Sequence, residues 1–166
     1  MAIPTSTLKL SIRETITLNN NKYDSFITKE IPSINEYSKR IITVPTTNQD
    51  IIKVSGSIGP GAYITEDVKY IRITNLDANN HVNLTFKNSR TPSGLTDEFA
   101  LKLDEGHSFI YPGLTTGGVS ASMVAADNAT AVSVGGADLL SMGSLTHVAA
   151  QASGSAVDLE LIIASS

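Results

Sequence analysis

Cysteine and tryptophan are absent from this sequence of 166 residues, and histidine occurs only three times. Without cysteine the chain can form no disulfide, thiolate metal site or cysteine nucleophile. Such a composition is typical of a protein that is made in a reducing compartment and is stable without covalent cross-links. Only four Phe and five Tyr are present, so the core must be built mainly from aliphatic residues and alanine.

Long hydrophobic runs are missing as well. No stretch approaches the roughly 20 apolar residues that span a bilayer as a helix. The first ten residues, MAIPTSTLKL, have no basic segment followed by an apolar run, so we expect no signal peptide. The sequence therefore predicts no membrane partner.

Basic residues are missing from the last third of the chain. All twelve Lys and Arg lie between Lys9 and Lys102, and twelve acids precede residue 112, whereas residues 112–166 contain four acids and no base. The net charge of −4 therefore belongs to the C-terminal third. A nucleic-acid-binding protein needs a basic patch to neutralise phosphates, so nucleic acid is not an expected partner.

Short segments of alternating apolar and polar residues are the main structural signal. In residues 7–18, Leu8, Leu10 and Ile12 alternate with polar residues, which predicts a half-buried strand with a bulge, an edge or a polar gap at Glu14. The predicted fold class is all-β: one domain over 1–166, an antiparallel β-sandwich or jelly-roll-like barrel with little or no helix. Further strands are predicted within residues 23–31 (stopped by Pro32), 38–44 (stopped by Pro45), 50–59, 68–75, 81–86, 98–111 and 156–165.

Two segments have the pattern of β-hairpins. The first is 70–88, YIRITNLDANNHVNLTFKN, where Asn and Asp suit the turn between two alternating strands. The second is 99–111, FALKLDEGHSFIY, where Gly106 can adopt positive φ in the turn. Residues 33–41, SINEYSKRI, predict one or two helical turns capped by Ser33, or a loop.

Residues 112–143 differ from the rest, because they are rich in Gly and Ala and contain no base. A structureless loop of this length is improbable inside a compact domain. The segment either supplies further short strands of small residues or is ordered only against a neighbouring subunit. Residues 1–6 are a possible N-terminal arm. The predicted partner-docking residues in these two segments are Ile3, Pro4, Leu114, Met123, Leu139, Leu140 and Met142.

No residue pattern in the chain carries a recognisable chemistry. His81, His107 and His147 are not spaced from one another, or from acids, as metal ligands are. A cation site at Asp77, Asn79 and Asn80 lacks the acidic density and the glycine of a calcium loop. There is no G-x-S-x-G elbow and no phosphate-binding loop. We therefore predict no catalytic residue, no cofactor and no metal, and a protein that is not an enzyme.

The chain resembles small virion proteins of tailed bacteriophages, marine phages in particular. The resemblance lies in VKYIRITNLDANNHVNLTF, in FALKLDEGHSFIYPG, in the small-residue stretch that follows and in AVDLELIIAS near the end. It covers about the C-terminal two-thirds and implies a non-enzymatic β-fold used in assembly, without assigning site residues. The expected location is the virion, after synthesis in the host cytoplasm.

The expected function is therefore a virion structural protein, most simply a capsid cement or decoration protein. Its partners would be other virion proteins, either a major capsid protein or further copies of itself in a homo-oligomer. Two alternatives stay open: a tail, connector or fibre component, and a glycan-binding lectin-like module. Strand addition at edges and arms is the usual way in which β-proteins bind their neighbours.

Overall fold

The computed structural model describes residues 6–55, 62–64, 67–89, 96–112 and 145–166. These residues form β-strands and their connections, with no helix in the described part, as the alternation predicts. The strands are β1 (Ser6–Leu18), β2 (Asn21–Ile34), β3 (Glu36–Val44), β4 (Gln49–Ser55), β5 (Ala62–Ile64), β6 (Val68–Asn75), β7 (Val82–Ser89), β8 (Thr96–Leu103), β9 (Ser108–Pro112), β10 (Leu145–Ala152) and β11 (Val157–Ser165).

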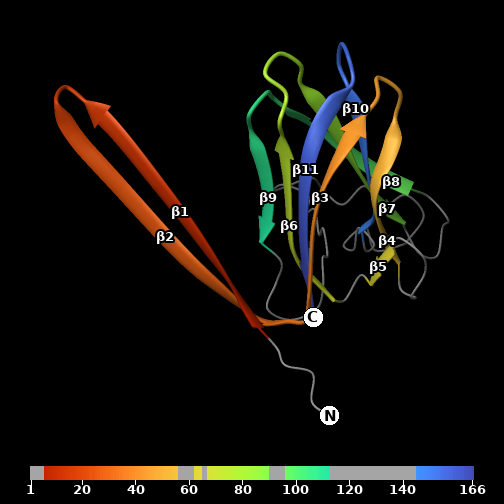
Figure 1. Cartoon of the computed structure of the whole chain (residues 1–166), viewed down its shortest axis with the longest axis horizontal. Helices are drawn as coiled ribbons and strands as arrows, with labels where there is room; N and C mark the ends of the chain where they lie inside the picture. The colour runs from red at the N-terminus through yellow and green to blue at the C-terminus, as the bar shows by residue number, and fades with distance from the viewer. Residues whose placement is uncertain (1–5, 56–61, 65–66, 90–95, 113–144) are drawn as a thin grey trace, which may run out of the picture.

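Strands β3 to β11 form a body of two sheets that pack face to face (Figure 1). One sheet has the order β3-β11-β6-β9 and the other β5-β4-β10-β7-β8. All neighbours are antiparallel except β4 and the short edge strand β5, which are parallel. Without β5, each sheet has four strands, and β3–β4, β6–β7, β8–β9 and β10–β11 each connect the two sheets. This is the topology of a jelly roll.

The core lies between the two sheets and is aliphatic, as the scarcity of aromatic residues requires. Side chains from both sheets are fully buried there, among them Ile73, Leu84, Leu159 and Leu161. Three of the phenylalanine rings meet at one place in it, where Phe86 stacks on Phe99 at 4.7 Å and contacts Phe109 at 5.0 Å, both distances between ring centroids. Because Phe109 belongs to the opposite sheet, these rings join the two layers.

The two predicted hairpins have the right strands and the wrong partners. Strand β6 lies in one sheet and β7 in the other, so residues 70–88 pass from sheet to sheet. The same is true of β8 and β9 in residues 99–111, although Gly106 does adopt the predicted positive φ of 70°. Alternation shows only that one face of each strand is buried. The pattern is the same whether the next strand pairs in the same sheet, as in a hairpin, or lies in the opposite sheet of a sandwich.

Two predicted boundaries also change. Residues 36–44 are strand β3 and not helical, because their backbone pairs with β11 along its whole length. Strand β2 continues to Ile34 and does not stop at Pro32. The pairing with β1 shifts register next to this proline, and Ser33 has a φ of 62°. Pro32 therefore lies at an irregularity of the ladder, where the hydrogen bond that a proline cannot donate is not required.

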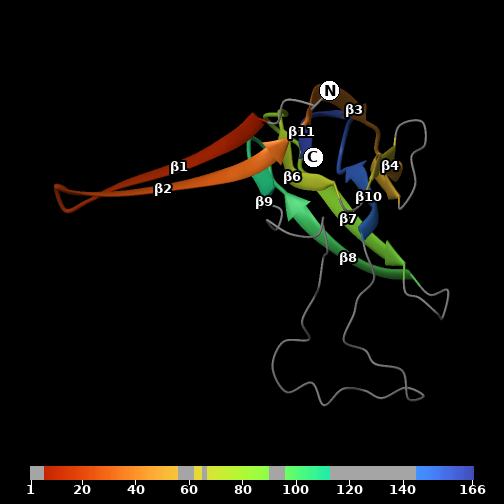
Figure 2. The same ribbon diagram turned by 90° about the horizontal axis from the view of Figure 1, so that it is seen from below.

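The most distinctive feature is the β1–β2 hairpin, which projects away from the body (Figures 1 and 2). Its strands pair from Ser6 and Ile34 at the base to Leu18 and Asn21 at the tip. Asn19 and Asn20 form the two-residue loop with φ of 50° and 63°, the pair of positive values that a type I′ turn requires. This two-stranded sheet shares no strand with the body.

Candidate functional site

The β1–β2 hairpin has one apolar and one polar face. The register places Ile12 opposite Ile27 and Ile16 opposite Tyr23, and alternate side chains of paired strands share a face. Glu14, Ser25, Lys29 and Asn21 are the polar interruptions on this side. The apolar face thus consists of Leu8, Leu10, Ile12, Ile16, Leu18, Tyr23, Ile27 and Ile31.

The base of this face is covered by the body. Ile31 is 1% exposed and packs, with Ile34, against Tyr70, Ile162 and Ala164. Leu8 and Leu10 of the hairpin and Ile110 of β9 complete the cluster. These partners lie on the outer face of the β3-β11-β6-β9 sheet, and burial there raises the pKa of the Tyr70 hydroxyl. The backbone N–H of Asn35 also donates to the carbonyl of Ser165 at 2.9 Å, which ties the hairpin's end to the last strand.

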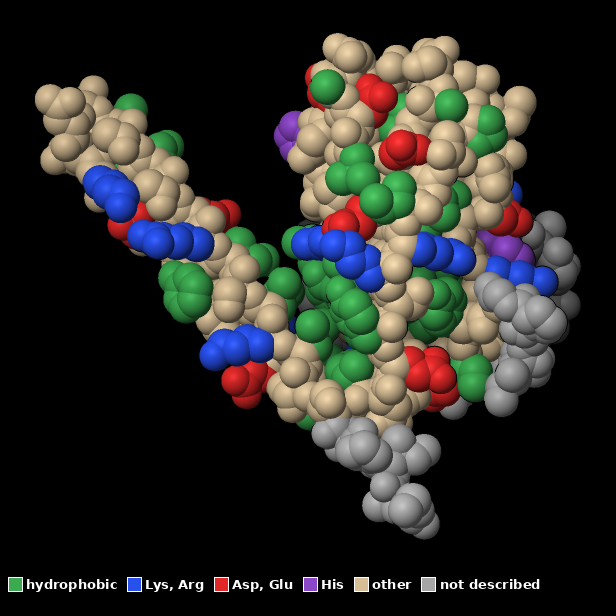
Figure 3. Space-filling model, viewed as in Figure 1, with side chains coloured by type: hydrophobic (Ala, Val, Ile, Leu, Met, Phe, Trp, Pro, Cys, Tyr) green, Lys and Arg blue, Asp and Glu red, His purple; other side chains and the backbone are tan. Residues whose placement is uncertain are grey.

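The outer half of the same face is uncovered. Beyond Leu10 the body no longer reaches the hairpin, and exposure rises from 1% at Ile31 to 58% at Ile27, four residues further out on β2. Figure 3 shows hydrophobic side chains both on the hairpin and on the part of the body that it faces. We call the exposed group the outer patch; it consists of Ile12, Ile16, Leu18, Tyr23 and Ile27.

The opposite face carries hydroxyls and charges. Thr15 donates to Asp24 at 2.7 Å, and Lys22 pairs with the same carboxylate at 3.1 Å. The hydrogen bond from Thr15, followed by that from Lys22, lowers the pKa of Asp24. Phe26, opposite Arg13, is the one large apolar side chain on this face. A face of this kind suits water, whereas an apolar strip of several large residues suits a protein partner.

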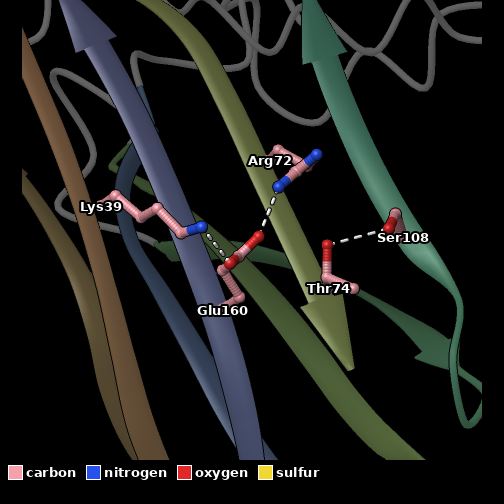
Figure 4. A network of polar contacts seen from close by, with 5 residues as sticks. All are labelled: Lys39, Arg72, Thr74, Ser108 and Glu160. Atoms are coloured by element: carbon pink, nitrogen blue, oxygen red, sulfur yellow. Dashed lines mark hydrogen bonds and ion pairs between the residues drawn. The ribbon is translucent and has the colours of Figure 1, made fainter. Parts of the chain in front are cut away.

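A charged group lies on the outer face of the sheet that receives the hairpin (Figure 4). Glu160 of β11 accepts from Lys39 of β3 at 2.8 Å and forms a short ion pair with Arg72 of β6. The hydrogen bond from Lys39 is the main reason that the pKa of Glu160 is lowered, and the same contact raises the pKa of Lys39. On β3 this face also exposes Tyr37 and Ile41, at 58% and 60%.

The polar segment around Asp77 is a structural turn. The Asp77 carboxylate accepts from the backbone N–H groups of Asn79 and Asn80, each at 2.7 Å, and these bonds lower its pKa. Asn75 is fully buried and donates to the carbonyls of Asn80 and Leu103 at 2.9 and 3.3 Å. Oδ1 of Asp77 and the amide of Asn75 therefore hold the connection between β6 and β7.

Two of the histidines, His81 and His107, lie within electrostatic range of the Asp104 carboxylate. His81 precedes β7, His107 contacts the carbonyl of Glu105 through its Nδ1 at 2.9 Å, and His147 lies within β10. Within the described ranges no three His, Asp or Glu side chains come together as a metal site. Nor does any helix of that part have the length and hydrophobicity to cross a membrane.

One hollow of about 370 Å³ lies at the end of the body near the C-terminus. Arg40 at its wall donates to the carbonyl of Ile51 at 2.7 Å. The wall mixes charged, hydroxyl and aromatic groups, and it is formed by Glu36, Arg40, Ala62, Tyr63, Ile64, Asp67, Ser165 and Ser166.

The docking residues predicted from the sequence lie outside the described residues: Ile3, Pro4, Leu114, Met123, Leu139, Leu140 and Met142. The sequence interpretation of residues 7–18 as half-buried is wrong for the outer part of β1, where both faces are exposed. The signal that could have indicated a projecting hairpin is the length of its two strands, Ser6–Leu18 and Asn21–Ile34, which only Asn19 and Asn20 separate. A hairpin of that length exceeds the usual strand of about five or six residues and must extend past a small body.

No protein-family model, no curated protein and no solved structure matches the chain.

Proposed function

We propose that this protein is a non-enzymatic structural subunit that binds neighbouring protein subunits through the β1–β2 hairpin. The observation that carries the proposal is the change of burial along one apolar face, from 1% at Ile31 to between 38% and 59% over the outer patch. An isolated two-stranded hairpin is marginal in water. Five large apolar side chains exposed side by side on such a hairpin are typical of a protein interaction site.

Particle assembly is the setting that suits this subunit, and capsid decoration is its simplest form. The support is the resemblance to small virion proteins, the jelly-roll body, which occurs in capsid proteins, and the projecting hairpin. Fold alone does not assign function, so the hairpin carries more weight than the jelly roll. A tail, connector or fibre location would use the same hairpin in the same way.

The test is rebinding to particles. Virions in which mass spectrometry finds the protein are stripped of it, and purified variants are added back and followed by co-sedimentation. The double variant Ile16→Ser and Ile27→Ser removes two apolar side chains from the outer patch. If each contributes about 1.5 kcal/mol of burial, binding falls by on the order of a hundredfold. Rebinding of this variant with wild-type affinity would overturn the proposal.

The matched control is Thr17→Ser with Thr28→Ser, two substitutions to serine on the polar face of the same hairpin. It should rebind like the wild type, because that face is solvated on both strands. Equal loss in both double variants would point to damage of the hairpin and not to the outer patch.

A glycan-binding module is the second candidate, and the hollow near the C-terminus favours it, since Arg40, Asp67 and Tyr63 offer charge, hydrogen bonds and a ring. A monomer that is retained on a glycan array and is absent from virions would establish this function in place of assembly. Loss of retention in Arg40→Ala would locate the glycan in the hollow.

A further inference from the structure

Two surfaces of the described part of the chain expose large apolar side chains. One is the outer patch on the hairpin, and the other is the β3 side of the outer face of the β3-β11-β6-β9 sheet, where Tyr37 and Ile41 are exposed. Between them lies the intramolecular contact of the hairpin base, where Ile31 packs beside Ile162 and Tyr70. The uncovered surfaces are thus continuous with an interface that the chain already forms.

We infer that the outer patch of one copy packs on the outer face of strands β3 and β11 of a second copy, so that hairpins are exchanged between subunits. This inference rests on the proposed function and names the partner. The base contact shows that this hairpin face and this sheet face fit each other, because the same two surfaces bury Ile31, Ile162 and Ala164 to 8% exposure or less within one chain. A second copy extends the same contact along both surfaces.

Charge is compatible with the same occupant. The outer patch is interrupted by Glu14, which has no ion-pair partner among the described residues. On the receiving face Lys39 and Arg72 share the carboxylate of Glu160, and the Asp158 carboxylate accepts from the Thr43 hydroxyl at 2.7 Å, so two cations are balanced by two acids. A hairpin placed so that Glu14 lies beside Lys39 or Arg72 therefore meets opposite charge on the next copy.

Symmetry sets the form of the complex. Each copy contributes its hairpin to one neighbour and binds the hairpin of another on its sheet face, so the contact is head-to-tail. Such contacts generate a ring when the rotation closes and a filament when it does not. Because a closed ring leaves no outer patch uncovered, we expect one discrete oligomer.

The absence of cysteine makes the contact directly testable by disulfide trapping. Ile16→Cys, in a chain with a size tag, is mixed with untagged Ile41→Cys, and the mixture is oxidised and separated on a denaturing gel. The mixed disulfide can form only between two chains. The control pair is Thr17→Cys with Ile41→Cys, since Thr17 is the neighbour on the polar face. We expect the first pair to give a mixed dimer band at least tenfold stronger than the control pair.

Light scattering on the wild type should show one oligomer, and Ile16→Ser with Ile27→Ser should be monomeric. Equal trapping of both cysteine pairs, or a wild-type monomer at the concentrations used for trapping, would overturn the exchange. A wild-type monomer that still rebinds particles through the outer patch would overturn the exchange and leave the proposed function standing. A wild-type monomer whose binding to particles does not depend on the outer patch would overturn both the exchange and the proposed function.

Discussion

The hairpin and the body are made of the same kind of strand and differ in what covers them. In the body, Leu84 and Leu159 are fully buried because two sheets face each other, and most of β11 is buried on both of its faces. In the hairpin, Leu18 lies on an equally apolar face and is 58% exposed. Alternation along a strand therefore tells which residues share a face, but a second layer decides whether that face is a core or a surface.

This difference also separates two sources of stability. The body is held by its own core, to which buried side chains of both sheets contribute. The hairpin has only its internal pairing and the small cluster at its base. Regions with few buried apolar contacts open at lower free energy than the core. We therefore expect the hairpin to open without unfolding the body, and a partner on the outer patch to stabilise it.

The strongest contrast comes from one chemical change made in both regions. Leu84→Ala in β7 removes a fully buried side chain, so the free energy of unfolding should fall by about 2–5 kcal/mol. Leu18→Ala near the tip should change it by about 0.5 kcal/mol or less. Denaturant unfolding, followed by circular dichroism at a concentration where the chain is monomeric, measures both values. A similar loss in the two variants would show that the tip is covered within the single chain.

An intermediate effect is expected at the base of the hairpin. Ile31→Ala should weaken the cluster with Tyr70 and Ile162 by about 2 kcal/mol, at the low end for a buried isoleucine, since solvent lies close to this small cluster. The loss should be local. Hydrogen exchange should rise in β1 and β2 and stay unchanged in β7 and β10.

Ile27→Ala is the matched control, because Ile27 lies on the same strand and the same face but is 58% exposed. It should leave the exchange of the hairpin base unchanged. If Ile31→Ala instead raised exchange throughout the body, the hairpin and the body would form one cooperative unit.

Strand positions could be predicted from the sequence, whereas strand partners could not. The predicted strand at residues 68–75 is β6, the one at 156–165 contains β11, and Pro45 stops β3 as expected. The pattern in 70–88 is the same for a hairpin and for a crossing between sheets, so the partner of β6 was unpredictable from it. Loop length held the missing information: Asn19 and Asn20 are a two-residue turn that joins paired strands, while residues 76–81 are longer and span two layers.

The candidate site could not be predicted from the sequence for a related reason. Leu8, Leu10 and Ile12 alternate as they would above a core, and nothing in residues 7–18 tells that the body ends near Leu10. Only the packing of the body fixes how far the hairpin is covered. The amides around Asp77 form a turn, as the sequence predicted, because Asn75 and Asp77 bond the backbone of their own loop.

The smallest effect is expected from the charges beside the hairpin base. The pKa of Glu160 is lowered in the folded chain, chiefly by the hydrogen bond from Lys39, so its contribution is present above the unfolded pKa near 4.5 and is lost as the pH falls through the folded value. The pKa of Lys39 is raised, so its contribution is present below 10.5 and is lost as the pH rises through the folded value. The pair therefore stabilises the fold between about pH 5 and pH 10.

A double-mutant cycle with Glu160→Gln and Lys39→Met isolates this contribution. The coupling between the two positions should be favourable at pH 7 and should shrink below pH 4, as Glu160 is protonated. It should stay small throughout, because the Lys39 side chain is 53% exposed and water screens the pair. A coupling that is equal at pH 7 and pH 3 would mean that the contact depends on packing of the two side chains and not on charge. In an exchanged oligomer the second copy's hairpin would cover these side chains, so the same cycle should then give a larger coupling at pH 7 than in the monomeric Ile16→Ser and Ile27→Ser background.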